Sequence, residues 1–335
     1  MKVALFSCKA GEEGFFEACN KKYQQDLFFF QSPLTRQSTK LAKGFTAISV
    51  FVNDCLNEEV LEQLKKQGTQ LITLRCAGYD HVDLEAANEL KLHITYVPDY
   101  SPYAVAEHAL ALMLCLNRQL IASHEHVQQA NFSLKGLMGF DMYGKTIGIV
   151  GTGKIGSILV KMLRGLGCQV LAVDPVVNPE CIQLGAQYVD FDKMLENADI
   201  ISLNCPLNSS TKYLINHNTL KKMKDGVMLI NISRGAVLNT SDVIDALKSK
   251  KIAYLGIDVY EKEKGLFFED HSEEGIHDET LSELLNLPNV LVTPHQAFYT
   301  REAMENISQV TLENIHCFEK GLPLKHELTT IVSGN

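Results

Sequence analysis

Side chains that can bind a carboxylate or move a proton follow three apolar segments in the second half of the chain. They are Arg234 after GVMLINIS, Glu261 and Glu263 after AYLGIDVY, and His295 after NVLVTP. An arginine binds a carboxylate through two parallel hydrogen bonds, a histidine exchanges protons near neutral pH, and a carboxylate stabilises a charged imidazole. If the three segments are neighbouring strands, this set predicts acid–base chemistry on a small carboxylic acid.

A glycine-rich turn, GTGKIG, follows the apolar run KTIGIV and precedes a helical segment. Gly151, Gly153 and Gly156 permit a tight turn, close approach of a pyrophosphate to the main chain, and close helix packing. Asp174 ends the next apolar run, QVLAVD, where a carboxylate can accept from ribose hydroxyls. The pattern predicts NAD in preference to NADP, and with the acid–base set it indicates a dehydrogenase of 2-hydroxy or 2-keto acids.

Metal-dependent chemistry is disfavoured at the places where the sequence suggests it. Residues 148–154 fit the start of a phosphate-binding P-loop, but Ile155 stands where the Mg²⁺-binding serine or threonine is needed. His124 and His126 are two residues apart in a helical segment and do not share a helix face. We therefore expect no metal site.

The first hundred residues alternate apolar runs with amphipathic segments. The apolar runs are KVALFS, LFFFQ, AISVFVN, QLITLRC and HITYVP. Helical periodicity in the segments between them, such as NEEVLEQLKKQG and DLEAANELK, predicts βα units and a parallel sheet. Ser101 and Pro102 then form a helix start, and AVAEHALALMLCLNRQL predicts one long helix that begins a new domain.

A second series of six apolar runs predicts a doubly wound parallel sheet. The runs are KTIGIVG, QVLAVDP, ADIISLNCP, GVMLINIS, AYLGIDVYE and NVLVTPH. An acidic insertion between Glu261 and Pro288 exceeds ordinary connection lengths, and we interpret it as a surface excursion in preference to a functional loop. The helical segment TREAMENISQVTLENIHCFEKG ends at Gly321, and the sequence leaves its domain undecided.

Composition limits the class of protein. The 335 residues suffice for two hydrophobic cores, and 31 basic against 40 acidic residues give a net charge of −9, which disfavours a nucleic-acid partner. No apolar run approaches the roughly 20 residues of a membrane span, and the start lacks a signal-peptide pattern, so we expect no membrane partner and a cytoplasmic location. The nine cysteines are odd in number and form no CxxC pair, which favours reduced thiols.

Long motifs resemble the D-isomer-specific 2-hydroxyacid dehydrogenases nearly end to end. The motifs are RCAGYDHVDL (75–84), VPDYSPYAVAEHALALMLCLNR (97–118), NFSLKGLMGFDMYGKTIGIVGTGKIG (131–156), NISRGAV (231–237), GIDVYEKE (256–263), LFFED (266–270) and TPHQAF (293–298). LFFED and the insertion around it favour the branch that acts on D-lactate. The resemblance implies NAD-dependent reduction of a 2-keto acid, with pyruvate and D-lactate as the expected pair.

The resemblance also implies a two-domain α/β fold. Residues 1–100 and 300–335 are expected to form a flavodoxin-like catalytic domain, and residues 101–299 a Rossmann domain with a doubly wound parallel sheet that binds NAD. The active site is expected in the cleft. The family commonly forms dimers or tetramers through the cofactor domain, so a homodimer or homotetramer is expected.

Residue roles follow from the matching motif positions. Arg234 is expected to bind the substrate carboxylate and keto oxygen, His295 to donate the proton, and Glu263 to hydrogen-bond that histidine, which makes Glu261 a neighbour only. Two further groups are expected at the substrate: the main-chain N–H groups of Ala77 and Gly78, which hold its carboxylate, and Tyr100, which lies against it. The expected NAD contacts are Gly151, Gly153, Lys154, Ile155, Gly156, Asp174, Cys205, Pro206, Thr211, Ile232, Ser233, Arg234 and Asp258.

Two alternatives remain open at this stage. One is a dehydrogenase for bulkier acids such as phenylpyruvate or 2-ketoisocaproate, because the sequence does not place the side chains that line the substrate site. The other is a non-catalytic protein that senses NAD(H), since some relatives with this fold act as corepressors. The intact set of Arg234, Glu263 and His295 argues against the second.

Overall fold

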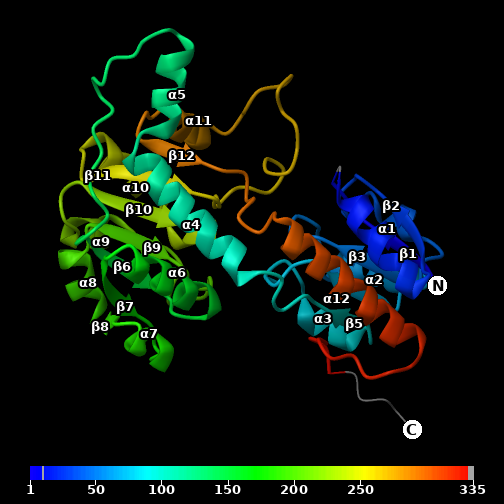
Figure 1. The fold of residues 1–335 in the computed structure, drawn as a ribbon. Coiled ribbons are helices and arrows are strands. Elements are labelled where there is room, and N and C mark those ends of the chain that lie inside the picture. Colours follow the sequence, from blue (N-terminus) through cyan, green and yellow to red (C-terminus); the bar gives the residue numbers. More distant parts are fainter. Residues whose placement is uncertain (10, 331–335) are drawn as a thin grey trace. The chain divides into compact units, whose positions relative to one another are not determined.

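The structure is a computed structural model that describes residues 1–9 and 11–330, and the chain in it forms two compact units (Figure 1). Unit 1 comprises Met1–Ser101 and the chain from Tyr299 onward, and unit 2 comprises Pro102–Phe298. Each unit has a parallel sheet with helices on both faces, which confirms the predicted α/β class. Within the described ranges, no helix combines the length and apolar character that crossing a bilayer requires.

The sheet of unit 1 contains the five predicted strands. They are β1 (Lys2–Leu5), β2 (Asp26–Phe29), β3 (Ala47–Val50), β4 (Leu71–Leu74) and β5 (His93–Thr95). Their order is β2-β1-β3-β4-β5 and all neighbours are parallel. This is the flavodoxin order, in which the chain reverses direction across the sheet between β1 and β3.

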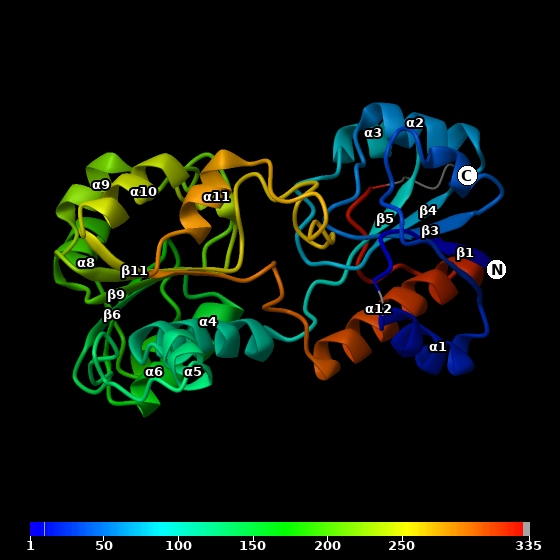
Figure 2. The same ribbon diagram turned by 90° about the horizontal axis from the view of Figure 1, so that it is seen from above.

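Helices cover both faces of this sheet (Figure 2). One face carries α1 (Glu12–Tyr23) and α12 (Arg301–Glu319), and the other carries α2 (Glu58–Lys66) and α3 (Leu84–Glu89). A short 3-10 helix, η1, spans Thr39–Ala42. The C-terminal helix, whose domain the sequence left undecided, therefore belongs to unit 1. It begins after the N-cap Thr300 and ends before Gly321, whose φ of 64° stops the helix.

The sheet of unit 2 has seven strands where the sequence predicted six. They are β6 (Thr146–Val150), β7 (Gln169–Val173), β8 (Gln187–Tyr188), β9 (Ile200–Leu203), β10 (Val227–Asn231), β11 (Ile252–Ile257) and β12 (Val290–Val292). The additional strand, β8, has two residues, too few to show a periodic pattern. The parallel order β12-β11-β10-β9-β6-β7-β8 is the Rossmann arrangement extended by one strand, with its switch point between β6 and β9.

Helices also cover both faces of this second sheet. Figure 2 shows α4 (Pro102–Asn117) and α6 (Lys154–Gly165) on one face and α8 (Phe191–Asn197), α9 (His217–Lys222), α10 (Thr240–Lys248) and α11 (Glu279–Leu285) on the other. A short helix, α7, spans Pro179–Gln183, and a 3-10 turn, η2, spans Gly235–Val237.

The single long helix predicted after Pro102 is two helices. The chain breaks between α4 and α5 (Leu120–Gln128), where Gln119 has the left-handed φ of 51°. Asn117 exchanges hydrogen bonds with the main chain of Phe140 through both its amide nitrogen and its amide oxygen. These contacts with a distant segment fix the end of α4, which the apolar pattern could not indicate.

The acidic insertion is only partly a surface excursion. Phe267, Leu281 and Leu284 are buried and belong to the core of unit 2. Its first half is irregular and its second half forms α11. The expectation of a surface excursion is therefore wrong for these positions, because the apolar side chains within the acidic sequence anchor the segment to the sheet.

Candidate active site

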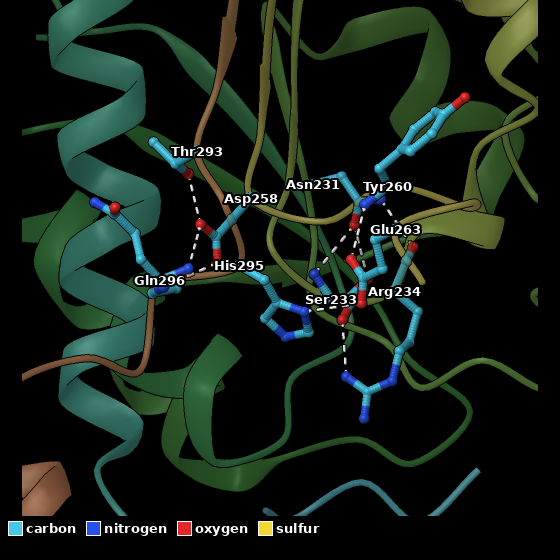
Figure 3. A network of polar contacts seen from close by, with 10 residues as sticks. Asn231, Ser233, Arg234, Asp258, Tyr260, Glu263, Thr293, His295 and Gln296 are labelled. Carbon is cyan, nitrogen blue, oxygen red and sulfur yellow. Dashed lines mark hydrogen bonds and ion pairs between the residues drawn. The ribbon is translucent and has the colours of Figure 1, made fainter. Parts of the chain in front are cut away.

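The predicted acid–base residues lie at one edge of the sheet of unit 2. Arg234 follows β10, Glu263 follows β11 and His295 follows β12, and these three strands are neighbours. Because the strands are parallel, their carboxyl ends meet at the same edge. Figure 3 shows the three side chains at these strand ends.

Glu263 and His295 form a direct pair. The Oε1 atom of Glu263 lies 2.9 Å from Nδ1 of His295, and its Oε2 accepts from the main-chain N–H of Tyr260 at 3.1 Å. The histidine and glutamate side chains are 17% and 23% exposed, and the Phe268 ring lies 5.6 Å from the imidazole, centre to centre. With Nδ1 held by the carboxylate, Nε2 is the atom that can exchange a proton with a ligand.

The backbone of His295 has a strained conformation that the surrounding structure maintains. Its φ is 55°, which is uncommon for a residue other than glycine. The fully buried Asp258 accepts from the Thr293 hydroxyl at 2.5 Å and from the N–H groups of Gln296 and Ala297, each at 2.9 Å (Figure 3). Asp258 thus fixes the loop that carries the histidine, and its predicted contact with NAD stays a prediction.

The turn that carries Arg234 is built around a buried asparagine. Asn231 accepts from both the N–H and the hydroxyl of Ser233, at 3.1 and 2.8 Å, and its amide nitrogen donates to the carbonyl of Arg234 at 2.9 Å. The guanidinium of Arg234 donates to the Ser233 carbonyl at 2.9 Å. Ile232 is buried within the same turn. These bonds determine where Arg234 leaves the sheet.

Geometry separates the two glutamates that follow β11. Glu263 bonds to His295, whereas Glu261 lies beside Tyr213. The negative charge of Glu261 and its hydrogen bond with the phenol raise the pKa of Tyr213. The structure therefore provides a matched pair of carboxylates on one loop, of which one contacts the imidazole.

The glycine turn after β6 leaves no room for a side chain at Gly151 and Gly156, whereas a Cβ on Gly153 would meet no atom within 4 Å. A Cβ on Gly151, whose φ is 92°, would lie 2.7 Å from the carbonyl oxygen of Asn204, and one on Gly156 would lie 2.0 Å from the carbonyl oxygen of Gly151. The turn leads into α6, with Gly153 as N-cap and Lys154 and Ile155 in the first turn. A tight turn and a helix N-terminus at the switch point fit the pyrophosphate of a dinucleotide.

Asp174 joins this turn to the end of β7. Its Oδ2 accepts from the Thr152 N–H at 2.7 Å and its Oδ1 from the Val176 N–H at 2.9 Å. Each carboxylate oxygen has further lone-pair capacity, so both can also accept from ribose hydroxyls. The residues present thus fit an adenosine ribose beside the glycine turn.

The predicted contacts after β9 form a compact turn. Cys205 is buried, and burial raises the pKa of its thiol to about 11, so it packs as a small neutral side chain. The hydroxyl of Thr211 donates to the carbonyl of Pro206 at 2.6 Å. Thr211 therefore shapes the turn that carries Cys205 and Pro206.

Several residues that support the site have no recognisable signal in the sequence. The Tyr188 hydroxyl donates to Thr152 Oγ1 at 2.8 Å and accepts from the Asn178 N–H at 2.9 Å, and the Asn178 amide donates to the Thr152 carbonyl at 2.9 Å. In the histidine loop, His108 Nε2 lies 3.0 Å from Thr293 Oγ1. Three of these four contacts join residues at least 26 positions apart in the chain.

The remaining predicted substrate residues belong to unit 1. Ala77 and Gly78 follow β4 at the carboxyl edge of the sheet, and Tyr100 lies, half-buried, between β5 and the end of the unit's first segment. Within residues 1–9 and 11–330, the N–H groups of Ala77 and Gly78 donate no hydrogen bond. Two neighbouring unpaired main-chain donors are suited to a carboxylate.

No cluster of three or more histidine, cysteine, aspartate or glutamate side chains in the described part of the chain is arranged to hold a metal ion. His124 and His126 lie on α5, and none of the residues of this helix is buried.

Comparison with known proteins agrees with this geometry. Residues 110–297 match the model of the D-isomer specific 2-hydroxyacid dehydrogenase NAD binding domain. A D-lactate dehydrogenase of Escherichia coli is 46% identical over 98% of this chain and 100% of its own length, and a 2-hydroxyacid dehydrogenase homolog of Haemophilus influenzae is 46% identical over 96% and 97%.

A solved structure described as the pyruvate reductase of Chlamydomonas reinhardtii superposes with a TM-score of 0.92 at 42% identity, covering 97% of this chain and 98% of that one. These relatives match the chain nearly end to end, so the matched length includes the glycine turn, Asp174 and the Glu263–His295 pair. The chain belongs to the D-isomer-specific 2-hydroxyacid dehydrogenases, a family of NAD-dependent oxidoreductases.

Proposed function

We propose that this protein is a D-lactate dehydrogenase of the cytoplasm, which reduces pyruvate to D-lactate with NADH. The observation that carries the proposal is the Glu263–His295 pair at the strand edge that also presents Arg234. Relatives described as D-lactate dehydrogenase and pyruvate reductase support the choice of substrate.

Each residue has one task in this proposal. Arg234 binds the substrate carboxylate and keto oxygen, and the N–H groups of Ala77 and Gly78 hold the same carboxylate. Tyr100 lies against the substrate. Bound NADH supplies the hydride that reduces the keto carbon. His295 gives the proton on Nε2 to the keto oxygen, and Glu263 stabilises the charged imidazole from the Nδ1 side.

The experiment that tests the substrate compares initial rates of NADH oxidation with pyruvate and with phenylpyruvate. We expect a higher kcat/KM for pyruvate. A higher value for phenylpyruvate would select the alternative of a dehydrogenase for bulkier acids. Tight NADH binding without oxidation by any 2-keto acid would instead select a non-catalytic NAD(H) sensor.

Asp174 should determine the preference for NADH over NADPH. The carboxylate of Asp174 would repel the negatively charged 2′-phosphate of NADPH. Asp174→Ala should therefore reduce the ratio of kcat/KM for NADH to kcat/KM for NADPH by at least about tenfold. Because Asp174 also holds the Thr152 N–H, the variant should bind NADH less tightly. Asp192→Ala, at an exposed ion pair with Lys222, is the control and should leave the ratio unchanged. Equal use of both cofactors by the unmodified protein would contradict the assignment.

Glu263 should set the pH range of pyruvate reduction. Glu263→Gln removes a negative charge from Nδ1 of His295, which disfavours the protonated imidazole that reduction requires. The fall in kcat/KM with rising pH should therefore move to lower pH, as measured by pH–rate profiles of both proteins.

Glu261→Gln is the matched control, because Glu261 lies beside Tyr213. Its pH profile should coincide with that of the unmodified protein. A shift of the pH profile in Glu261→Gln but not in Glu263→Gln would show that Glu261 is the carboxylate that acts on His295. If neither variant shifts the profile, the group that stabilises the charged imidazole is neither of these glutamates.

We also propose that the protein is a homodimer or homotetramer assembled through unit 2. Large apolar side chains are exposed along residues 120–143, with Leu134 at 83% and Met138 at 88% exposure. The others in this segment are Leu120, Ile121, Val127, Phe132 and Tyr143. Clusters of exposed apolar side chains mark interaction surfaces. Sedimentation velocity of Leu134→Lys should show a shift toward the monomer, and a monomeric unmodified protein would refute the assembly.

A further inference from the structure

A buried cluster of ionisable side chains in unit 1 has no part in the chemistry proposed above. Its members are Arg75, Glu12 and Asp54, which are 2%, 3% and 1% exposed. Removing ions from water is costly, and apolar side chains of similar volume often stabilise a core equally well or better. Stability alone therefore does not account for a cluster of this kind.

The Arg75 guanidinium joins three strand ends. Nη2 donates to the carbonyls of Phe6 and Ser7 at 2.6 and 3.3 Å, and Nη1 donates to the Ser49 hydroxyl at 3.2 Å. Phe6 and Ser7 follow β1, Ser49 lies in β3, and Arg75 itself follows β4. The side chain thus spans the switch point between β1 and β3, where open α/β sheets ordinarily bind ligands.

A second element of the cluster holds a strained residue. Ser7 has a φ of 51°, a conformation that persists in a non-glycine residue only where neighbours enforce it. Its hydroxyl donates to Asp54 at 2.7 Å, and Asp54 also accepts from the N–H groups of Leu34 and Phe51, each at 2.6 Å. Arg75 and Asp54 together therefore fix the segments that follow β1 and β3.

Glu12 is the loosest member of the cluster. Its Oε2 lies 3.9 Å from Arg75 Nη2 and has no hydrogen-bond partner within the described ranges. The carboxylate lies at the start of α1, where the helix dipole favours negative charge. Arg75 is accordingly held mainly by main-chain carbonyls and not by its counter-ion.

The residues that follow Arg75 include Ala77 and Gly78, whose main-chain N–H groups are the two unpaired donors described above. The Arg75 N–H donates to the Val50 carbonyl at 2.9 Å, and the Cys76 carbonyl accepts from the Val97 N–H at 3.3 Å. The Cys76 thiol donates to the Gly78 carbonyl at 3.1 Å. Ala77 and Gly78 therefore continue from a strand end whose main chain and Arg75 side chain are both hydrogen-bonded to neighbouring segments.

We propose that Arg75 is a positioning residue, which holds the main chain of Ala77 and Gly78 where their N–H groups receive the substrate carboxylate. With a side chain that is 1% exposed, Arg75 acts through the main chain and does not touch the substrate. The inference rests on the proposed function, because only a 2-keto acid substrate gives these two donors their task.

The test compares Arg75→Met and Arg75→Lys with the unmodified full-length protein. Arg75→Met keeps the volume but removes every donor, so KM for pyruvate and Kd for oxamate at saturating NADH should rise about ten- to hundredfold. The kcat value should change less than about threefold, since no proton-transfer group is altered. Kd for NADH should be unchanged, because the NAD-binding domain lies in unit 2. Arg75→Lys, which keeps one donor group, should give a smaller rise.

Leu64→Ala controls for stability. Leu64 is fully buried on α2, near the turn that leads into the amino end of β4. Truncating it destabilises unit 1 at the sheet edge opposite to the one that carries Arg75. Its KM for pyruvate should stay near that of the unmodified protein even with a lowered Tm.

If Arg75→Met folds and its KM for pyruvate and Kd for oxamate are unchanged, the positioning role of Arg75 is wrong while the proposed function stands. The same conclusion follows if Leu64→Ala, at a similar Tm, raises KM for pyruvate as much as Arg75→Met does. If Arg75→Met does not fold, an unchanged KM in Arg75→Lys overturns it. Failure of the unmodified protein to reduce pyruvate would overturn the proposed function, and this inference with it.

Discussion

Replacing His295 with alanine should lower kcat for pyruvate reduction by about 10² to 10⁴, the usual contribution of a positioned proton donor. Its Nδ1 is held by Glu263, and the loop around it is fixed by Asp258, so the imidazole is oriented before substrate arrives. Kd for NADH, measured by fluorescence titration, should change less than about threefold, since the glycine turn and Asp174 are untouched.

The backbone at His295 calls for a second variant. Its φ of 55° is unfavourable for alanine, whereas asparagine adopts this conformation more readily. His295→Asn should therefore retain the loop and still lose the proton donor, with a fall in kcat similar to that of the alanine variant. His277→Ala, at an exposed histidine of the insertion, is the control and should be fully active. A kcat within about threefold of the unmodified value in both His295 variants would refute the proton-donor assignment.

Arg234→Lys should lower kcat/KM for pyruvate by about 10²-fold or more. Lysine keeps the positive charge but loses the planar pair of donors, and each hydrogen bond to a charged group contributes about 1.5 to 3 kcal/mol. The turn that Asn231 builds should survive, because its bonds to residue 234 involve the main chain. Steady-state kinetics should show both a raised KM and a lowered kcat.

Arg36→Lys is the matched control for this substitution, since Arg36 is exposed and pairs with Glu59. It should leave all kinetic constants unchanged. Activity of Arg234→Lys equal to that of the control would mean that positive charge alone suffices and that paired hydrogen bonds are not required.

Most of the strand edge could be predicted from the sequence because parallel strands buried on both faces read as continuous apolar runs. The residues of β9 and β10 are entirely buried, and the polar side chains that follow such strands are conspicuous. This pattern predicts Arg234 and His295 as site residues. The family resemblance favoured Glu263 over Glu261, and the structure adds the hydrogen bond from Glu263 to His295.

What the sequence could not indicate depends on contacts between distant segments. Asn231 and Asp258 look like ordinary strand-end residues, and their task of holding the arginine turn and the histidine loop follows only from the folded sheet. Arg75 lies in a motif that predicted Ala77 and Gly78, yet its burial between β1 and β3 has no periodic signal. The break after Asn117 likewise depends on Phe140.

The configuration of the lactate that the protein forms is the sharpest test of the proposed D-lactate dehydrogenase activity. Neither residue spacing nor the strand edge reveals which face of the keto acid receives the hydride, so the D configuration rests on membership of the family. Pyruvate and NADH are incubated with the purified full-length protein, and the lactate is resolved by chiral chromatography. We expect D-lactate as the product, and L-lactate would exclude the proposed D-lactate dehydrogenase activity.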